Sequence, residues 1–475
     1  MKGSGLALLA AALLAACAVG PDYKRPQIEA PGEWRIDYPK AAEIANTQWW
    51  KQFGDPTLDQ LIETALRENL DVQAASARID QFLGMLSTTR SQFFPQFGYG
   101  ADASRNRASQ AGPTPLAPGT NTNYSLYQGA LNASWQIDLF GRVRRQSEAA
   151  QAQVYASEQG RRGVILSVVS TAAVSYVALR ALDRELEIAS ATARNYADTK
   201  ALFQLRFAGG VVSEVELAQI ESQYQQALAA IPSLEQSIAA QENLISVLLG
   251  RNPGAIPRGK SIDELVPPAI PAGLPSELLE RRPDILQAEH NLVAANASIG
   301  VAKSLYFPSI SVTGLFGSVS TAASAFLTGP AQTWSVGANL AGPIFTFGGI
   351  GGQVQSAEAG QQEAMLFYRQ TILNALRETN DALTGSQKKR EEAEAQARRV
   401  RALRDYARLS RLRFDNGVVS YIEVLFAENE LFAAELTAVN TQAERYSQLI
   451  NVYKAVGGGW VDEADKLTPK PRTAK

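Results

Sequence analysis

The sequence Arg206-Phe207-Ala208-Gly209-Gly210-Val211-Val212-Ser213 decides the fold, because the second half of the chain repeats it as Arg413-Phe414-Asp415-Asn416-Gly417-Val418-Val419-Ser420. Each copy lies between two stretches whose apolar spacing indicates helices. Gly210 and Gly417 permit the positive φ that ends a helix. The two copies therefore predict tight turns at the tips of two helical hairpins.

A very long helix is expected before each turn. Residues 142–207 contain no proline, and residues 353–414 contain none either. About 65 helical residues make a rod of ~100 Å, which is longer than a globular domain needs. Pro232 lies inside the helix expected after the first turn and should kink it.

The helices after the turns carry coiled-coil seams, with apolar residues alternating at steps of three and four. In the first half the seam comprises Leu217, Ile220, Tyr224, Ala227, Ile231, Leu234, Ile238, Ile245 and Leu248. In the second half it comprises Phe432, Leu436, Val439, Ala443, Tyr446, Ile450 and Tyr453.

A second repeat defines the two halves. Residues 71–95 and 284–308 each begin with Asp, read as a helix and end aromatic-aromatic-Pro. We therefore predict two structural repeats, 56–250 and 276–458, each with the order helix, strand, strand, long helix, turn, helix. Residues 251–275 are rich in proline and are expected to be a linker.

Each half also contains two segments in which apolar and polar residues alternate. They cover residues 97–103 and 125–139 in the first half, and 309–316 and 334–340 in the second. The longest can cross a membrane, which takes ~9–11 tilted residues. Aromatic residues gather at the strand ends, as in the girdle of a membrane barrel. The alternative is an ordinary half-buried sheet; the long helices favour the barrel.

Four strands cannot close a barrel, because known barrels start at eight strands. An open sheet in lipid would leave unpaired backbone groups, each costing several kcal/mol. The chain should therefore pool its strands with copies of itself. Two copies would give a barrel filled with side chains, whereas three give twelve strands and an open lumen.

The N-terminus reads as a bacterial lipoprotein signal. Residues 1–16 combine Lys2 with a Leu/Ala run too short to span a bilayer, and Leu14-Ala15-Ala16-Cys17 fits a lipoprotein box. We expect a signal peptide over 1–16, a lipid on Cys17 and a lipid-anchored segment over 17–55. Ala18 after the cysteine favours the outer membrane. The alternative is a plain signal peptide with an incidental cysteine. Residues 459–475 form a C-terminal tail.

Composition excludes several functions. Lys+Arg number 45 and Asp+Glu 47, so no basic surface for nucleic acid is expected. One His and one Cys make a transition-metal site and an internal disulfide untenable. The run Gly348–Gly352 lacks the spacing of a phosphate loop, and no cluster of catalytic residues is visible. The rivals to a channel are a coiled-coil spacer lipoprotein and a displayed enzyme.

The chain resembles the outer membrane factors, efflux lipoproteins of the TolC/OprM/NodT type. The motifs that carry the resemblance are Cys17 to Pro26, Trp49-Trp50 with Phe53-Gly54-Asp55-Pro56, Leu58 to Ile62, Trp135 to Arg142, Arg281 to Ile285, the two turns, and Gly457-Gly458-Gly459-Trp460. They cover nearly the whole mature chain.

The resemblance implies a mainly α, TolC-like fold with membrane β: a homotrimer with a twelve-stranded barrel in the outer membrane, continuing into a long periplasmic α-helical barrel. It implies a passive exit duct in a tripartite efflux system and no enzyme activity. The partners would be a periplasmic adaptor (a membrane fusion protein) and an inner-membrane resistance-nodulation-division transporter. No cofactor is implied beyond the lipid on Cys17.

By the same resemblance, the tip turns would dock the adaptor, and the helix from Ser420 would line a periplasmic constriction. The docking residues would be Arg206, Gly210, Val211, Val212, Ser213, Arg413, Gly417, Val418, Val419 and Ser420.

The constriction departs from the family pattern. Relatives often read Asp-Ala-Gln-Arg where this chain has Phe426-Ala427-Glu428-Asn429. We therefore expect an apolar gate from Ile422 and Phe426 with Glu423 nearby, in place of an acidic ring. The alternative is that Phe426 packs between helices.

Overall fold

The computed structural model describes residues 18–27, 48–111, 117, 119–270, 278–457 and 459–471. Cys17, the proposed lipidation site, lies outside these residues, as does the signal sequence. The chain divides into two compact units. The first contains the described part of Met1–Gln27 with Asp80–Ala156 and Ala288–Tyr368; the second contains the described parts of Ile28–Ile79, Ser157–Gln287 and Arg369–Lys475.

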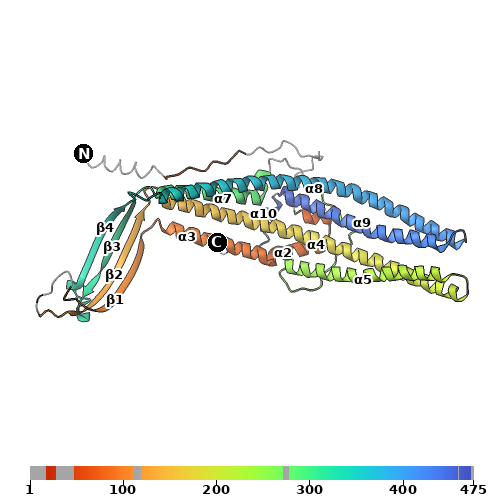
Figure 1. Ribbon diagram of the computed structural model, residues 1–475, viewed down its shortest axis with the longest axis horizontal. Coiled ribbons are helices and arrows are strands. Elements are labelled where there is room, and N and C mark those ends of the chain that lie inside the picture. Colours follow the sequence, from red (N-terminus) through yellow and green to blue (C-terminus); the bar gives the residue numbers. More distant parts are fainter. Residues whose placement is uncertain are drawn as a thin grey trace. The chain divides into compact units, whose positions relative to one another are not determined.

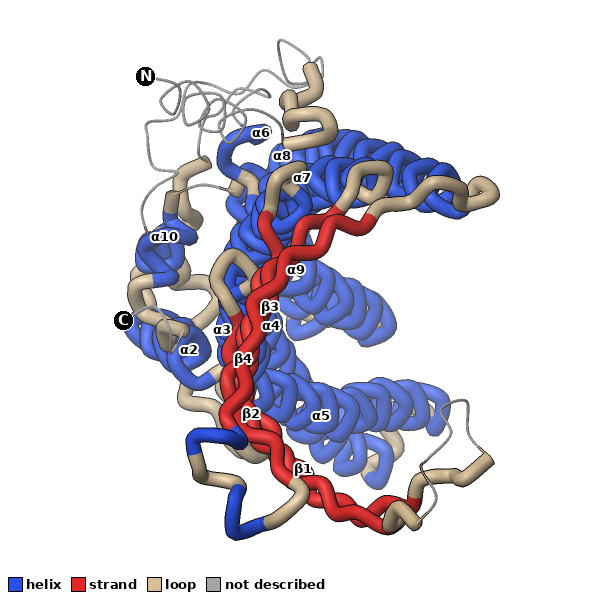
Figure 2. Tube along the Cα trace, turned by 90° about the vertical axis from the view of Figure 1, so that its left-hand side faces the viewer, coloured by secondary structure: helices blue, strands red, loops and turns tan. Residues whose placement is uncertain are grey.

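The first unit contains an antiparallel four-stranded sheet in the order β1-β2-β3-β4, drawn in red in Figure 2. The strands are β1 (Gln96–Arg107), β2 (Asn123–Ile137), β3 (Ser309–Ser320) and β4 (Gln332–Ala341). They lie where the sequence predicted alternating segments, and β1 and β3 extend further than expected. The shortest has 10 residues, which is enough to cross a membrane.

The strand register places the apolar residues of all four strands in shared rows. One row joins Tyr99, Leu131, Phe316 and Trp334, and another joins Phe97, Ala133, Gly314 and Val336. The row between them joins Gly98, Asn132, Leu315 and Ser335, whose side chains point to the opposite face because strand side chains alternate. One face of the sheet is therefore apolar, and its aromatic residues are exposed.

Residues 18–27, which follow Cys17, pack within the first unit. The Arg145 guanidinium donates hydrogen bonds to the Val19 and Gly20 carbonyls and pairs with Asp22. A Cβ on Gly141 would come within 2.6 Å of the Ala18 Cα, so only glycine allows this approach. This segment is thus seated where β2 gives way to the following helix.

Two helical hairpins carry the predicted turns (Figure 1). The first is α4 (Arg142–Ala208) with α5 (Glu214–Leu248), and the second is α8 (Gly349–Asp415) with α9 (Tyr421–Val456). Both α4 and α8 have 67 residues, which confirms the predicted long helices. Pro232 lies within α5, which continues through it.

Shorter helices complete the fold. The predicted medium helices are α3 (Leu70–Ser91) and α7 (Pro283–Ser304). The remaining short elements were not predicted. The α-helices among them are α2 (Pro56–Glu68), α6 (Leu278–Arg281) and α10 (Trp460–Asp465), and the 3-10 helices are η2 (Trp49–Phe53), η4 (Ala323–Ala325) and η5 (Gly329–Ala331). In the second unit Trp49 stacks on Tyr453 at 5.0 Å and meets Trp460 edge-on, which ties the chain ends into one core.

Helix α4 contains an apolar stretch that is buried in the core of the chain. Among the described residues α4 is the one helix long and apolar enough to cross a membrane, but 72% of that stretch is buried inside the chain. Ile165, Val169 and Tyr176 are fully buried. A core position therefore explains its composition.

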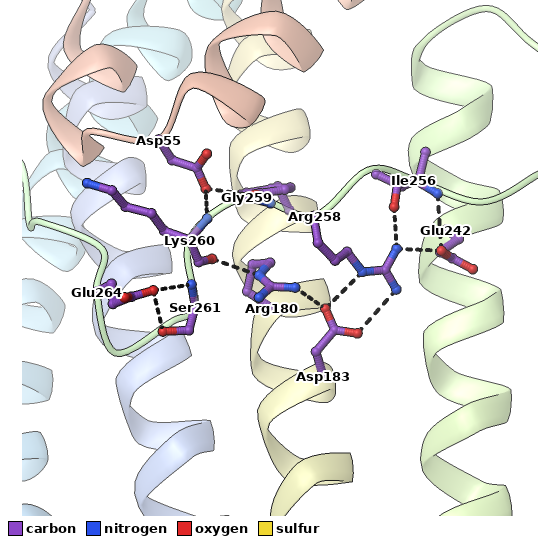
Figure 3. A network of polar contacts seen from close by, with 11 residues as sticks. Asp55, Arg180, Asp183, Glu242, Ile256, Arg258, Gly259, Lys260, Ser261 and Glu264 are labelled. Carbon is purple, nitrogen blue, oxygen red and sulfur yellow. Dashed lines mark hydrogen bonds and ion pairs between the residues drawn. The ribbon is translucent and has the colours of Figure 1, made fainter.

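The described part of the proline-rich segment, 251–270, has no regular helix or strand but packs firmly in the second unit. The Arg258 guanidinium pairs with Asp183 on α4 and Glu242 on α5, as Figure 3 shows. Asp55 accepts a hydrogen bond from the Lys260 backbone N–H at 3.0 Å. Ile262 and Leu265 are buried in the core. The segment is therefore an ordered brace across the helices.

Candidate functional site: the hairpin tips and the start of α9

The first tip ends α4 and starts α5 with a complete set of caps. Gly210 has a φ of 72°, and the Val211 N–H donates back to the Arg206 carbonyl at 2.9 Å. The Ser213 side chain accepts from the Glu216 N–H, and Glu216 accepts from the Ser213 N–H at 2.8 Å. This reciprocal capping box satisfies two backbone donors of α5.

The second tip has the same backbone but a different cap. Gly417 has a φ of 70°, and the Val418 N–H donates to the Arg413 carbonyl at 2.9 Å. The positive φ predicted at both glycines is thus confirmed. Ser420, however, makes no side-chain cap. Glu423, which corresponds to Glu216, accepts instead from Arg413 Nη1 at 2.9 Å and from Ser410 Oγ at 3.3 Å.

Aromatic rings join the two tips. Phe203 on α4 lies 4.4 Å from Tyr421 on α9 and 6.2 Å from Phe414 on α8, centroid to centroid. The Arg206 guanidinium lies 5.6 Å from the rings of both Phe203 and Phe414, a favourable cation–π distance. The structure therefore brings both predicted turns together in one cluster. Sequence reasoning missed this cluster, although aromatic residues beside each turn gave a signal for it.

Each tip also exposes apolar side chains at matching positions. Val211 is 75% exposed and its counterpart Val418 is 64% exposed. The other exposed pairs are Leu205 with Leu412, and Val215 with Ile422. Val212 in the first turn packs against the core between the hairpins. Ser420 lies at the end of the second turn. The tips thus present two similar apolar surfaces.

The first turns of α9 present the predicted gate residues. Ile422 is 50% exposed and Phe426 is 60% exposed, and residues four apart share one face of a helix. Phe426 therefore does not pack between helices of its own chain. Glu423 lies beside this face and is held by Arg413, so its carboxylate belongs to the turn.

The described residues contain no group of three or more His, Cys, Asp or Glu side chains that could hold a metal ion. His290 lies on α7, 5.4 Å from the Tyr155 ring. Burial lowers the pKa of His290 below its usual value, with Glu289 acting in the opposite direction. A partly buried imidazole packed on a phenol fits a structural role for this residue.

A sheet with one apolar exposed face and one polar face, continued by helices of 67 residues, defines the class of outer-membrane channels with helical extensions. Comparison with known proteins gives the particular family. A model of the outer membrane efflux protein family matches residues 61–251 and 274–458. The chain belongs to this family.

Full-length relatives agree. The chain is 31% identical to the solvent efflux pump outer membrane protein SrpC of Pseudomonas putida over 97% of this chain and 99% of SrpC. It is 32% identical to the cation efflux system protein CusC of Escherichia coli over 94% of this chain and 96% of CusC. The solved outer-membrane channel OprN superposes with a TM-score of 0.84 at 30% identity, covering 94% of this chain and all of that chain.

The fold is therefore TolC-like, with long helices and four antiparallel strands in each chain. The protein is an outer-membrane channel of an efflux pump and is not an enzyme. As the outer-membrane component of a pump it works with pump partners.

Proposed function

We propose that three copies of this chain form a lipid-anchored duct that crosses the outer membrane and the periplasm. An inner-membrane transporter of the resistance-nodulation-division class would supply the energy, and a periplasmic adaptor would join it to the duct. The repeats 56–250 and 276–458 would each contribute one wall segment, with the described segment 251–270 bracing them.

The sheet carries this proposal. Among the described residues β1 pairs only with β2, and β4 pairs only with β3. Its apolar face suits lipid, where unpaired edge groups cost several kcal/mol each. Pairing β4 of one copy with β1 of the next satisfies both edges. Three copies give twelve strands and an open lumen lined by the polar face, whereas two would give a filled barrel.

The anchor of the duct would be a lipid on Cys17. Its support is the lipoprotein box and the seating of Ala18 against Gly141, next to the strand ends. A relative, SilC of Salmonella typhimurium, is described as a probable outer membrane lipoprotein and is 30% identical over 95% of this chain.

The adaptor would dock on the two tips. The exposed residues Val211 and Val418, flanked by Arg206 and Arg413, give each tip the same apolar and basic character. Two similar tips per chain would give a trimer six docking surfaces.

The gate would be the ring of Ile422 and Phe426 from three copies, with Glu423 fixing the turn beside it. Phe426→Ala should widen the constriction and raise both conductance and antibiotic entry. Unchanged values would count against a gate at this level.

Relatives bear names that refer to solvents, toluene, antibiotics and cations. We propose small molecules of this kind as cargo. The direct test is single-channel recording of the purified acylated protein in planar bilayers. Discrete conducting events of one size would support an open lumen, and a protein that inserts without conducting would overturn it.

A further inference from the structure

Behind the proposed gate, α9 carries a carboxylate on its other side. Glu428 follows Phe426 by two residues, so the two side chains point in roughly opposite directions from the helix axis. Glu428 lines a cleft of about 420 Å³ formed by α4, α8 and α9 within the second unit. Glu428 therefore lies on the side of α9 that faces away from Phe426 and the proposed gate.

The internal repeat shows what this carboxylate lacks. Glu221 occupies the same place in the first hairpin, since both residues lie eight positions after the serine of their turn. Lys200 Nζ lies 2.6 Å from Glu221 and Gln225 donates to it at 2.8 Å. The residue equivalent to Lys200 in the second hairpin is Ala407, which lines the cleft. The hairpin fold thus allows a close ion pair that the second copy does not make.

Three polar groups around the cleft lack a close polar partner among the described residues. The nearest cation to Glu428 is Arg411, at 4.0 Å, and within the described residues Glu428 accepts no hydrogen bond. Arg411 lies 5.7 Å from the Tyr421 ring, and its polar contacts are long, at 3.5 Å to the Tyr421 hydroxyl and 3.6 Å to Asp415. The Tyr196 hydroxyl, on a side chain only 2% exposed, has no hydrogen-bond partner in the described part of the chain.

The other charged groups facing the cleft have closer partners. Arg184 on α4 pairs with Glu187 at 2.9 Å, Glu435 on α9 pairs with Arg404 at 2.7 Å, and Arg408 on α8 pairs with Asp405 at 3.4 Å. Burial raises the pKa of Glu428, and Arg411 opposes this shift. Burial also raises the pKa of Tyr196, and the Glu428 charge adds to the effect.

We propose that Glu428 is a positioning residue for the gate and forms a latch with Arg411 and Tyr196. When its carboxylate is charged, it closes on the Arg411 guanidinium and the Tyr196 hydroxyl. Closing the latch draws the start of α9 into the cleft, which moves Ile422 and Phe426 back from the side they face. The location of the gate rests on the proposed function; the latch does not.

The test uses the full acylated protein with three variants. Glu428→Gln keeps the shape and removes the charge. Ala407→Lys places in the second hairpin the partner that Lys200 provides in the first. Lys200→Ala is the matched control, because it breaks the pair of the first hairpin only. Amide hydrogen exchange of residues 421–428 and single-channel conductance are each measured from about pH 4, near the ordinary glutamate pKa, up to about pH 8, because burial raises the pKa of Glu428.

In the unmodified chain, exchange of residues 421–428, once corrected for its intrinsic pH dependence, should slow as pH increases, and the open fraction should rise by about two- to fivefold, the range that a partly exposed ion pair supports. Glu428→Gln should remove the pH step, and Ala407→Lys should extend the slow-exchange state to lower pH. Lys200→Ala should alter only residues 214–221.

An exchange profile of residues 421–428 that is the same in Glu428→Gln and the unmodified chain at every pH would overturn the latch, even if Phe426→Ala changes conductance. If exchange follows the latch while Phe426→Ala leaves conductance unchanged, the latch stands and the gate assignment fails.

Discussion

The two hairpin tips have the same backbone and nearly the same sequence, yet they are held in different ways. The first is self-contained: Ser213 and Glu216 cap α5 reciprocally, and Lys200 neutralises Glu221. The second leaves Ser420 without a side-chain cap, sends Glu423 across to Arg413 and leaves Glu428 without a close partner. Its polar side chains therefore link α9 to α8 more than they stabilise the start of α9.

This difference shows how a duplicated unit can take two roles. A capped helix start resists unravelling, whereas a start held by cross-helix pairs can move when those pairs change. The first hairpin is thus suited to be a fixed wall and the second to be the moving part.

The aromatic cluster should be the strongest link between the tips. Phe203→Ala should destabilise both by ~3 kcal/mol or more, because a fully buried ring that contacts Phe414 and Tyr421 is lost. Native-state hydrogen exchange should show lost protection in 203–220 and in 414–428. Leu205→Ala, an exposed neighbour, is the control. Loss confined to the first hairpin would show that the tips are independent.

The tip glycines should be equally important in both hairpins. Gly210→Ala and Gly417→Ala should each cost ~1–2 kcal/mol, because both sites have positive φ and open space around them, which leaves backbone strain as the sole penalty. Chemical denaturation with exchange detection measures the cost. Gly84→Ala in α3, also in open space, should be neutral or stabilising. Unequal costs at the two tips would mean that their backbones differ in solution.

The capping serines should behave differently. Ser213→Ala should cost ~1 kcal/mol, since it removes a side-chain cap. Ser420→Ala should be close to neutral because its hydroxyl makes no cap. Exchange rates of the first four amides of α5 and α9 give the comparison directly. A similar loss at both positions would contradict the asymmetry described above.

Acid should affect the hairpins at different pH. The Lys200 hydrogen bond lowers the pKa of Glu221 below 4.5, so its contribution is present above the unfolded value and is lost as pH falls through the lowered one. Burial raises the pKa of Glu428 in the folded chain above its value in the unfolded chain. The neutral carboxyl therefore stabilises the open cleft at pH values below the unfolded pKa, and this stabilisation is lost as pH rises through the folded pKa. Exchange corrected for its intrinsic pH dependence should change below pH 4.5 in 214–221 and above it in 421–428. Coincident midpoints would refute the assignment.

Much of the fold could be predicted because its signals are local and repeated. Strand faces follow from period-two alternation, and the register then joined Leu131, Phe316 and Trp334 in the row that the alternation required. Absence of proline over α4 and α8, with a glycine at each turn, was enough for the hairpins. The short helix α10 was missed because it is held by the buried cluster of Trp49, Trp50 and Trp460, which is a tertiary feature. Helix α2 did carry local signals, since Asp55 caps it, Pro56 begins it and its apolar residues share one buried face.

The site could be predicted only in part. The turns follow from sequence, but the sequence leaves open both whether Phe426 is exposed and which partner a charged side chain selects. Nothing local distinguishes Glu216 from Glu423, yet one caps its helix and the other pairs with Arg413. Likewise, the loss of a partner for Glu428 is visible in sequence only once the two hairpins are aligned on their turns and Ala407 is seen in place of a lysine.

The most direct test of the central claim is the native mass of the detergent-extracted mature protein, because the open edges of the sheet require other copies to close it. A closed barrel of twelve strands should give the mass of three acylated chains, which persists on dilution and becomes that of a single chain only when the sheet unfolds. A stable monomer would contradict it, since four strands in one chain cannot close a pore.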